Sequence, residues 1–462
     1  MNQAKDVVEP VSITIFGATG DLAQKKLFPA LFQLYKKGFI GEKFHVVGFS
    51  RKQLSDAEFQ EFVHAIFIQK PDLYDNETIE KFLSHLHYIS GDLNEPKTYE
   101  ILKQKLGSLD TYEQECLNKV FYLAVTPAHY EATLRNISSV GLTIPCGTSS
   151  SSPETKWTRV LIEKPFGNNL EGAQNLDKLL GTLFDESQIF RIDHYLTKET
   201  LQNILSFRFN NTIFEPIWNK DYIESISIKL LENNIVGSRG ESYDPVGALR
   251  DVGQNHILQM LALVTMENPH TLKSDTIRSA RESILEHVEY HHTDTSLVRA
   301  QYKGYREEPG VNPQSETETY FKIELALEND RFRGVPIFIE SGKGFSQSNT
   351  EITITFKPIK NKLTFSIYPK EEISLQIFAK EPGFENIITP RILHLGEYSQ
   401  KNEPEAYERV LHDGLHGDHT LFTSTKEVLA EWKLITDILS HYPETKLLSY
   451  PVGTQYDTLN FS

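Results

Sequence analysis

Apolar runs and helical patterns alternate along the first part of the chain, and this alternation restricts the possible folds most strongly. The apolar runs have the length of buried strands and lie at Ser12–Phe16, Phe44–Phe49, Val120–Val125 and Val160–Glu163. Helical spacing of apolar residues follows the first two runs, over Lys26–Lys37 and Asp56–Gln69. Strands that alternate with helices predict a parallel sheet covered by helices on both faces.

After about residue 190 the pattern changes to short runs that alternate in polarity, as in antiparallel strands with one solvent-facing side. We expect such strands at Tyr222–Lys229, Thr319–Leu327, Val335–Ile339, Glu351–Phe356, Leu363–Ile367 and Ile373–Phe378. Long helices are expected at Ala248–Met266 and Ser424–Leu439. The predicted fold is an α/β Rossmann-type dinucleotide-binding domain over 1–190, then a larger α+β domain over 191–462 with a mainly antiparallel sheet. The serine run Ser149–Ser152 is expected to form a surface loop of the first domain.

The composition excludes several classes of protein. The formal net charge of −16 disfavours a nucleic-acid binder, which usually needs a basic face. No apolar run approaches the length of a membrane helix, and the N-terminus does not resemble a secretory signal. Cys116 and Cys146 are not spaced as a metal or redox pair, so two free, buried thiols in a reducing cytoplasm are expected. A chain this acidic must gather basic residues locally if it binds an anion.

A glycine-containing turn lies between the first strand and the first helix, with the sequence Gly17-Ala18-Thr19-Gly20-Asp21-Leu22. Glycine lets a backbone approach a pyrophosphate closely, and a helix N-terminus offers free N–H groups. The glycine spacing differs from the usual dinucleotide fingerprint, so a simple tight turn is the alternative interpretation. The position of the turn in the first βα unit favours dinucleotide binding.

The residues after the second strand indicate which dinucleotide binds. An NAD site usually has a carboxylate there, which holds the ribose hydroxyls. Ser50 and Arg51 follow the strand instead, and this pair suits the 2′-phosphate of NADP. The alternative is a surface arginine without a role. The sequence therefore predicts NADP as the cofactor and leaves NAD open.

Cationic residues lie at the ends of several predicted strands and at the start of a possible helix. Lys164 precedes a proline at the end of a parallel strand, where such sheets bind ligands. A helix that starts near Asp193 would place His194 and Lys198 on one face, and two cationic donors on one face suit a phosphate. Lys343 lies in a glycine-flanked turn after a strand. The alternatives are an N-cap role for Asp193 and solvated lysines.

His256 lies in a strongly apolar helical pattern. Val252, His256 and Met260 repeat at a spacing of four, which places the histidine along a partly apolar face. A hydrogen-bonded core histidine and a general base beside a substrate hydroxyl are the two interpretations. No metal site is predicted, because ligand spacing is absent around the other histidines, among them His85, His87, His291 and His292.

Taken together, these stretches resemble the glucose-6-phosphate dehydrogenase family. The matching pieces run in order from Ile15 to about Phe422 and cover most of the chain. They are GATGDLAQKKLFPAL, VVGFSRK, LIEKPFG, RIDHYLTKE, FEPIWNK, DVGQNHILQML, the Thr-Glu-Thr-Tyr and Gly-Val-Pro segments, and PEAYERVLHDGLHGDHTLF. The resemblance implies NADP-dependent oxidation of β-D-glucose 6-phosphate to 6-phosphoglucono-δ-lactone, the first step of the oxidative pentose phosphate pathway. It also implies a cytoplasmic homodimer or homotetramer.

The resemblance implies a role for each candidate residue. His256 would take the proton from the C1 hydroxyl as hydride leaves C1, and Asp193 would orient the histidine. Lys164, whose following proline is usually cis in this family, would touch both sugar and cofactor. The phosphate would be held by His194, Tyr195 and Lys198, and further sugar-site positions are Lys26, Glu232, Asp251 and Lys343. The dinucleotide site would comprise Gly17, Ala18, Thr19, Gly20, Asp21, Leu22 and Arg51. Residues 193, 198 and 256 must then converge around one anionic hexose.

Four positions depart from the family pattern and bear on substrate affinity. Thr197 replaces a glycine, and threonine would be strained there if the position needs an unusual backbone angle. Gly253 replaces a bulkier residue, Ser348 stands where many relatives have a second basic sugar-site residue, and Tyr368 replaces a polar contact.

Two other functions stay open at this stage. Sugar oxidoreductases of the glucose-fructose oxidoreductase and inositol dehydrogenase group also combine a dinucleotide domain with a Glu-Lys-Pro turn. They would not need His194 and Lys198 as a phosphate-binding pair. A non-catalytic dinucleotide sensor would keep the fold without turnover, although the presence of Asp193 and His256 argues against it.

Overall fold

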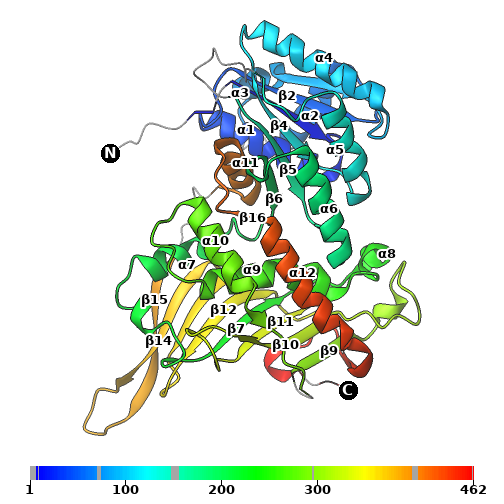
Figure 1. Cartoon of the computed structure of the whole chain (residues 1–462). Helices are drawn as coiled ribbons and strands as arrows, with labels where there is room; N and C mark the ends of the chain where they lie inside the picture. The colour runs from blue at the N-terminus through cyan, green and yellow to red at the C-terminus, as the bar shows by residue number, and fades with distance from the viewer. Residues whose placement is uncertain are drawn as a thin grey trace. The chain divides into compact units, whose positions relative to one another are not determined.

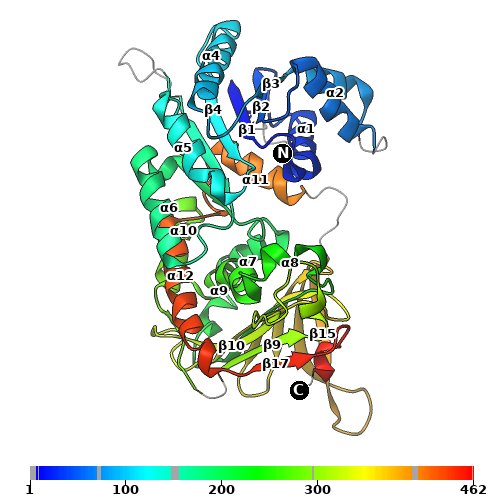
Figure 2. The same cartoon turned by 90° about the vertical axis from the view of Figure 1, so that its right-hand side faces the viewer.

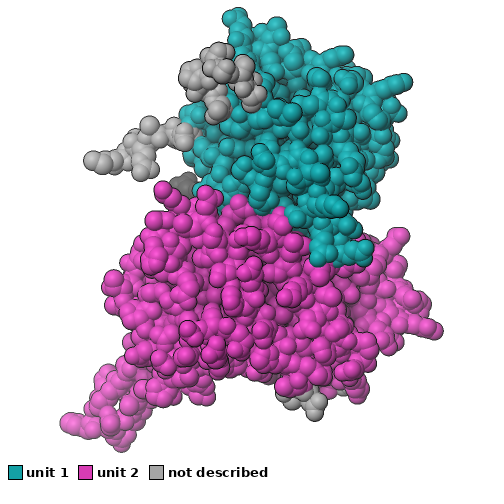
Figure 3. Space-filling view, viewed as in Figure 1, with its two compact units in different colours: residues 1–167, 171–194, 404–423 teal, residues 168–170, 195–403, 424–462 magenta. Residues whose placement is uncertain are grey.

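The computed structural model describes residues 7–8, 10–69, 74–146, 156–293, 296–397, 404–459 and 461. The chain forms two compact units, which Figure 3 shows in different colours. Unit 1 contains residues 1–167, 171–194 and 404–423, and unit 2 contains 168–170, 195–403 and 424–462. Unit 1 thus includes residues 404–423, which the predicted boundaries of 1–190 and 191–462 assign to the second domain. The predicted loop Ser149–Ser152 lies outside the described residues.

A seven-stranded sheet forms the centre of unit 1, in the order β16-β6-β5-β4-β1-β2-β3. The strands are β1 (Val11–Phe16), β2 (Phe44–Ser50), β3 (Leu86–Ser90), β4 (Asn118–Leu123), β5 (Thr158–Glu163), β6 (Ile189–Ile192) and β16 (Phe422–Thr423). Strands β1 to β6 pair in parallel, and β16 joins the edge antiparallel to β6. β1, β2 and β4 are buried along their whole length, polar residues such as Ser12, Thr14 and His45 included, because helices cover both faces of the sheet.

Helices cover both faces of this sheet (Figures 1 and 2). They are a π-helical turn (Ala23–Leu27), α1 (Phe28–Lys36), α2 (Asp56–Phe67), α3 (Asn76–Ser84), α4 (Pro96–Tyr112), α5 (Tyr130–Ser139), α6 (Leu170–Leu183) and α11 (Ala406–His416). One apolar core joins α1, α2, α3 and α11 to one face. On the opposite face, Tyr99 of α4 packs against Phe16 and Phe49. A capping box between Ser55 and Glu58 fixes the start of α2.

Unit 2 contains a ten-stranded sheet in the order β15-β14-β13-β12-β7-β11-β10-β9-β17, with β8 paired to β10. Its strands are β7 (Ile223–Leu231), β8 (Val288–Glu289), β9 (Leu297–Tyr302), β10 (Tyr320–Leu327), β11 (Ile337–Gly342), β12 (Asn349–Phe356), β13 (Lys362–Tyr368), β14 (Glu372–Lys380), β15 (Ile388–Glu397) and β17 (Leu447–Tyr450). Neighbouring strands are antiparallel, except that β7 pairs in parallel with β11 and β9 with β17. β12 buries every second residue, as its alternating sequence predicts.

Helices pack on one face of this second sheet (Figures 1 and 2). They are α7 (Glu199–Phe209), α8 (Gly240–Tyr243), a π-helical segment (Leu249–Ile257), α9 (Leu258–Thr265), α10 (Ser274–Leu285) and α12 (Thr425–Ser440).

Single 3₁₀ turns occur in both units, at Pro127–His129, Glu186–Gln188, Glu215–Ile217, Gly237–Arg239, Tyr305–Glu307, Tyr442–Glu444 and Tyr456–Thr458. The architecture confirms the predicted fold class. In the part of the chain that the structure describes, no helix is long and apolar enough to cross a bilayer.

The prediction for the cysteines is wrong. Cys116 and Cys146 are half-buried and form a disulfide, with their Cα atoms 6.3 Å apart. Cys116 directly precedes β4 and Cys146 follows α5, so the βα unit between them returns the chain to the same end of the sheet. A sequence separation of 30 residues gave no sign of this pairing, because the tertiary path creates the proximity.

Candidate functional site

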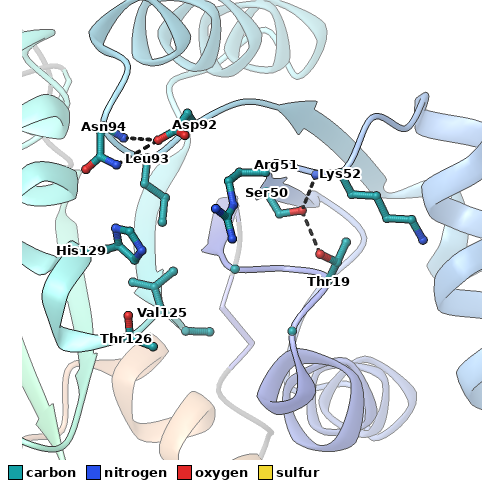
Figure 4. Close-up of a pocket in the computed structure, with 13 residues that line it drawn as sticks. Thr19, Ser50, Arg51, Lys52, Asp92, Leu93, Asn94, Val125, Thr126 and His129 are labelled. Carbon is teal, nitrogen blue, oxygen red and sulfur yellow. Dashed lines mark hydrogen bonds between the residues drawn. The ribbon is translucent and has the colours of Figure 1, made fainter.

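A pocket lies at the carboxyl end of the unit 1 sheet, between β1 and β4. The strand order 3-2-1-4-5-6 reverses at this point, and open α/β sheets bind ligands at such reversals. The cavity has a volume of about 420 Å³. It is lined by Gly17, Thr19, Gly20, Ser50, Arg51, Lys52, Asp92, Leu93, Asn94, Ala124, Val125, Thr126 and His129 (Figure 4).

Gly17 shows that this pocket fits a dinucleotide. Its φ is +85°, and a Cβ atom there would lie 2.3 Å from the carbonyl oxygen of Ala124. Glycine is therefore required, and its missing side chain leaves the backbone open to the pocket. The Gly17 N–H donates to the carbonyl oxygen of Phe49 at 2.8 Å, which holds the turn against β2. The result is a turn that leaves its backbone open to the pocket, as close approach of a pyrophosphate would require.

The wall of the pocket at the end of β2 is positively charged and hydrogen-bonded. Arg51 and Lys52 are exposed, whereas Ser50 is buried. The Ser50 hydroxyl lies 2.9 Å from the Thr19 hydroxyl and accepts from the Lys52 N–H at 3.4 Å, and Figure 4 marks both bonds. Two cations without a carboxylate at this position suit a 2′-phosphate.

The pocket contains some of the predicted cofactor residues and adds others. Gly17, Thr19, Gly20 and Arg51 line it. Among the other predicted residues, Ala18 is buried, and exposed Asp21 pairs with Lys25 at 2.6 Å. Leu22 and Lys164, which was predicted to touch both sugar and cofactor, also lie outside the lining. The lining residues that the sequence analysis missed follow strand ends or lie close by, namely Lys52, Asp92, Leu93, Asn94, Ala124, Val125, Thr126 and His129. The rule that ligands bind at the carboxyl ends of parallel strands would have indicated them.

The turn after β5 is fixed from two sides. The Lys164–Pro165 peptide bond is cis, as the family resemblance implies. The Tyr122 hydroxyl donates to the carboxylate of Glu163 at 2.6 Å, and the Tyr130 hydroxyl donates to the Glu163 carbonyl oxygen at 2.8 Å. Burial raises the pKa of the Glu163 carboxyl. The residue before Lys164 is thus held through both its side chain and its backbone.

No helix starts near Asp193, so the condition under which His194 and Lys198 would share a helical face is not met. Residues 194–197 form a turn, closed by the Lys198 N–H, which donates to the carbonyl oxygen of Tyr195 at 2.9 Å. α7 begins only at Glu199, and Lys198 is its extended N-cap residue with ψ of 132°. His194 and Lys198 therefore do not share a helical face. Asp193 is buried at the end of β6.

His256 lies in the π-helical segment of unit 2 and is 2% exposed. Its ring stacks on Tyr195, with ring centroids 4.2 Å apart and planes 27° apart. Its backbone N–H donates to the Asn255 side-chain oxygen at 2.6 Å. The helix expected at Ala248–Met266 is present, but its first part is π-helical, with hydrogen bonds between residues i and i+5, so the α-helical spacing of four does not describe which residues share a face there. Such π segments occur often at functional sites.

Lys343, Glu232 and Asp251 form a cluster in unit 2. Lys343 is 3% exposed and forms an ion pair with Glu232, and its ammonium lies 3.6 Å from the Asp251 carboxylate. Its position is fixed by the Tyr450 hydroxyl, which donates to the Lys343 carbonyl oxygen at 2.7 Å. Two half-exposed carboxylates around one buried ammonium offer acceptors for the hydroxyls of a sugar.

The candidate residues are divided between the units. Unit 1 carries Lys26, Lys164, Asp193 and His194, and Lys26 pairs with Glu405 at 3.7 Å within it. Unit 2 carries Tyr195, Lys198, Glu232, Asp251, His256 and Lys343. The predicted convergence of residues 193, 198 and 256 stays a prediction.

The structure explains two of the departures from the family pattern. Thr197 is unstrained, since the non-glycine residues with positive φ in the described ranges are Gln114, His270 and Lys360. A Cβ atom on Gly253 would lie 2.8 Å from Leu249 Cδ1 and 3.0 Å from Phe321 Cζ, so a larger residue needs its neighbours to move.

The other two departures lie on unit 2 as well. The Ser348 hydroxyl donates to the Asn233 side-chain oxygen at 2.8 Å and accepts from the Asn233 N–H at 2.9 Å. Tyr368 is half exposed at the end of β13. Nothing in the structure explains the tyrosine at this position.

Comparisons with known proteins agree with this geometry. The family model "Glucose-6-phosphate dehydrogenase, NAD binding domain" matches residues 14–203, and "Glucose-6-phosphate dehydrogenase, C-terminal domain" matches 205–458. The glucose-6-phosphate 1-dehydrogenases of Chlamydia pneumoniae and Aggregatibacter actinomycetemcomitans are 37% and 38% identical, each over 96% of this chain and 91% and 94% of their own.

A solved structure is similar over nearly the whole chain. It is a glucose-6-phosphate dehydrogenase in complex with its substrate glucose-6-phosphate, and it has a TM-score of 0.89 at 33% identity. The match covers 98% of this chain and 96% of the solved one. The chain therefore belongs to the glucose-6-phosphate dehydrogenase family.

Proposed function

We propose that this protein oxidises β-D-glucose 6-phosphate to 6-phosphoglucono-δ-lactone with NADP as the hydride acceptor, the first step of the oxidative pentose phosphate pathway. Family membership supports the reaction, and the similar solved structure holds its enzyme in complex with the substrate glucose-6-phosphate. The buried His256, stacked on Tyr195 in a π-helical segment, is the observation that carries the mechanism.

His256 acts as the general base that removes the proton from the C1 hydroxyl. A proton acceptor is needed at that oxygen because hydride departure from C1 leaves a carbonyl group there. Asp193 precedes by two residues the Tyr195 whose ring stacks on His256. Asp193 orients the imidazole and stabilises its charged form.

The phosphate of the substrate is bound away from the reacting carbon. His194, Tyr195 and Lys198 provide the donors for this group, and Lys26 and Lys164 add positive charge. Glu232, Asp251 and Lys343 contact the hydroxyls of the sugar. Because the phosphate does not react, its binding energy serves to hold C1 in place.

The charges at the end of β2 support NADP over NAD. Arg51 and Lys52 occupy the place where an NAD enzyme has a carboxylate, and both face solvent beside the pocket. A guanidinium matches the geometry of a phosphate and holds it through two hydrogen bonds. We therefore expect NAD to bind more weakly than NADP.

One assay tests the reaction and the cofactor preference. With glucose 6-phosphate, the kcat/KM for NADP is expected to exceed that for NAD by about 10-fold or more, the value of one charge-assisted hydrogen bond or two. Arg51→Ala should remove most of this difference, whereas Arg135→Ala, an exposed arginine on α5, should leave it unchanged. Equal rates with NADP and NAD would contradict the preference.

The same assay separates the other functions. Equal activity on free glucose would favour the group of sugar oxidoreductases that act without a phosphate. Tight NADP binding without turnover would favour a dinucleotide sensor. The family match over both domains opposes both of these functions.

We also propose that the protein forms a homodimer through the edge of the unit 2 sheet. β15 is the edge strand, and its hairpin with β14 projects from the unit (Figure 1). Large apolar side chains are exposed along it: Phe378, Phe384, Ile387, Ile388, Ile392, Leu393 and Leu395. An exposed apolar edge strand favours pairing with another chain, because it presents both free backbone groups and apolar surface.

Sedimentation or light scattering tests this surface. The wild type is expected at about twice the chain mass of 52.9 kDa, with tetramers as a further assembly of the dimers. The double variant Ile388→Glu/Ile392→Glu should sediment as a monomer, because it places charges on residues that are 61% and 59% exposed. The control is Ile101→Glu/Tyr112→Glu on α4, which should remain dimeric. A wild-type monomer contradicts the proposal.

We also propose that the protein is located in the cytoplasm. Two Arabidopsis thaliana relatives, each 34% identical, are named cytoplasmic glucose-6-phosphate 1-dehydrogenases.

A further inference from the structure

Tyr88 connects three parts of the cofactor pocket wall, although it does not line the pocket itself. It lies on β3, is 7% exposed, and packs its ring against Phe59 of α2 at 4.8 Å. Its hydroxyl donates to the carbonyl oxygen of Lys52 at 2.7 Å and lies 2.7 Å from the Ser50 hydroxyl. Both neighbours of Arg51 are therefore attached to one buried phenol.

The available hydrogens fix the direction of this hydrogen-bond chain. A tyrosine hydroxyl has one hydrogen, and the Lys52 carbonyl oxygen can only accept it. The Tyr88 oxygen must then accept from the Ser50 hydroxyl, and the Ser50 oxygen must accept from Thr19 at 2.9 Å. The chain runs from Thr19 through Ser50 and Tyr88 to Lys52. It links the glycine turn to the segment that carries the cations.

A second set of contacts anchors Tyr88 itself. Its backbone N–H donates to the Asp56 carboxylate at 2.7 Å, at the first residue of α2. The Gly91 N–H, at the other end of β3, donates to the carbonyl oxygen of Ser50 at 2.9 Å. The phenol is therefore part of a rigid frame that exists before any ligand binds.

We propose that Tyr88 is a positioning residue that sets the preference for NADP over NAD, an inference that rests on the proposed use of NADP. Arg51 is exposed, and an exposed segment loses conformational entropy when it binds a ligand. Tyr88 restricts the backbone on both sides of Arg51 in advance, which reduces this cost. NAD has no 2′-phosphate for the cations to bind, so its affinity depends less on this restriction.

Tyr88→Phe tests the proposal, because it removes the hydroxyl and keeps the ring on Phe59. The KM for NADP is expected to rise about 2- to 5-fold, as for the loss of one hydrogen bond, and by less than in Arg51→Ala. The KM for NAD and the kcat with either cofactor should stay within about twofold. In calorimetric titrations, binding of 2′,5′-ADP should weaken by the same factor as NADP, and binding of 5′-AMP should not.

Two further variants make the result specific. Tyr35→Phe is the matched control, because Tyr35 is also a buried tyrosine of unit 1 and its hydroxyl bonds to Glu42 at 3.2 Å, outside the pocket lining. It should leave the NADP to NAD ratio unchanged. Ser50→Ala removes another hydroxyl of the same hydrogen-bond chain, so it tests the proposal if Tyr88→Phe does not fold. It should change the NADP to NAD ratio in the same direction as Tyr88→Phe.

The outcomes separate this inference from the proposed function. A wild type that prefers NAD contradicts the proposed cofactor, whatever the variants do. A wild type that prefers NADP, combined with an equal rise of both KM values or an unchanged ratio in Tyr88→Phe, overturns the role of Tyr88. In the Arg51→Ala background the effect of Tyr88→Phe should shrink, because the phenol acts through that arginine.

Discussion

Replacing His256 with asparagine is expected to lower kcat by about 10² to 10⁴, the contribution of a general base. Asparagine is close in size and retains hydrogen-bonding groups, but it cannot take a proton from the C1 hydroxyl. His256 is buried against Tyr195, so bulk water is a poor replacement acceptor at that position. The KM for glucose 6-phosphate should change much less than kcat, because the phosphate contacts remain.

Steady-state kinetics with saturating NADP and glucose 6-phosphate measure this effect. His419→Asn is the matched control, since His419 is also buried but bonds through its ring to the carbonyl oxygen of Ser187 in unit 1. The control should keep kcat within about threefold, far from the loss expected for a general base. A His256→Asn variant with nearly full kcat, and an unchanged circular dichroism spectrum, would refute the base assignment.

Replacing Glu427 with alanine is expected to destabilise the protein by about 3–5 kcal/mol, the cost of leaving one partner of a buried ion pair without the other. Arg281 of α10 and Glu427 of α12 are both 0% exposed, and the Arg281 Nε–H donates to the carboxylate at 2.7 Å. The same carboxylate accepts the Ser424 N–H at 2.7 Å and so caps α12. Alanine removes the charge and the cap together.

Urea unfolding followed by circular dichroism and by tryptophan fluorescence, to which Trp432 on α12 contributes, measures the free-energy change. The control is Lys426→Ala on the same helix. Lys426 pairs with Glu282 of α10 at 3.5 Å, but its side chain is 70% exposed, so the expected loss is below about 1 kcal/mol. Glu427→Leu/Arg281→Met should be more stable than Glu427→Ala, because no charge remains buried. Equal losses in Glu427→Ala and Lys426→Ala would contradict this account.

The apolar runs that alternate with helical patterns predicted four of the seven strands of the first sheet, because strands covered on both faces are largely apolar. The predicted strands at residues 12–16 and 44–49 correspond to β1 and β2 within one residue at each end. β3, β6 and β16 were missed: β6 and β16 have only 4 and 2 residues, and His87 interrupts the apolar pattern of β3. The structure tolerates that histidine because its ring lies 3.1 Å from His45, and burial lowers the pKa of His87 to about 4, which keeps it neutral.

The cofactor pocket could be predicted only in part. Gly17, Thr19 and Gly20 belong to one strand–turn–helix unit, so local sequence places them at the pocket. His129 comes from another βα unit, and its place in the lining depends on the order of the strands. Tyr88 shows the same limit, since its hydroxyl matters through contacts with residues more than 30 positions away.

Local pattern thus fixed the fold class, the glycine turn and the choice of candidate residues, because each of these depends on neighbours along the chain. Contacts distant in sequence determined three other features. These are the π-helical segment around His256, the turn at 194–197 and the pairing of Cys116 with Cys146. The spacing of apolar residues cannot distinguish an α-turn from a π-turn when the whole segment is buried, as residues 252–257 are. Packing decides there, because Gly253 against Phe321 and His256 against Tyr195 must both be accommodated.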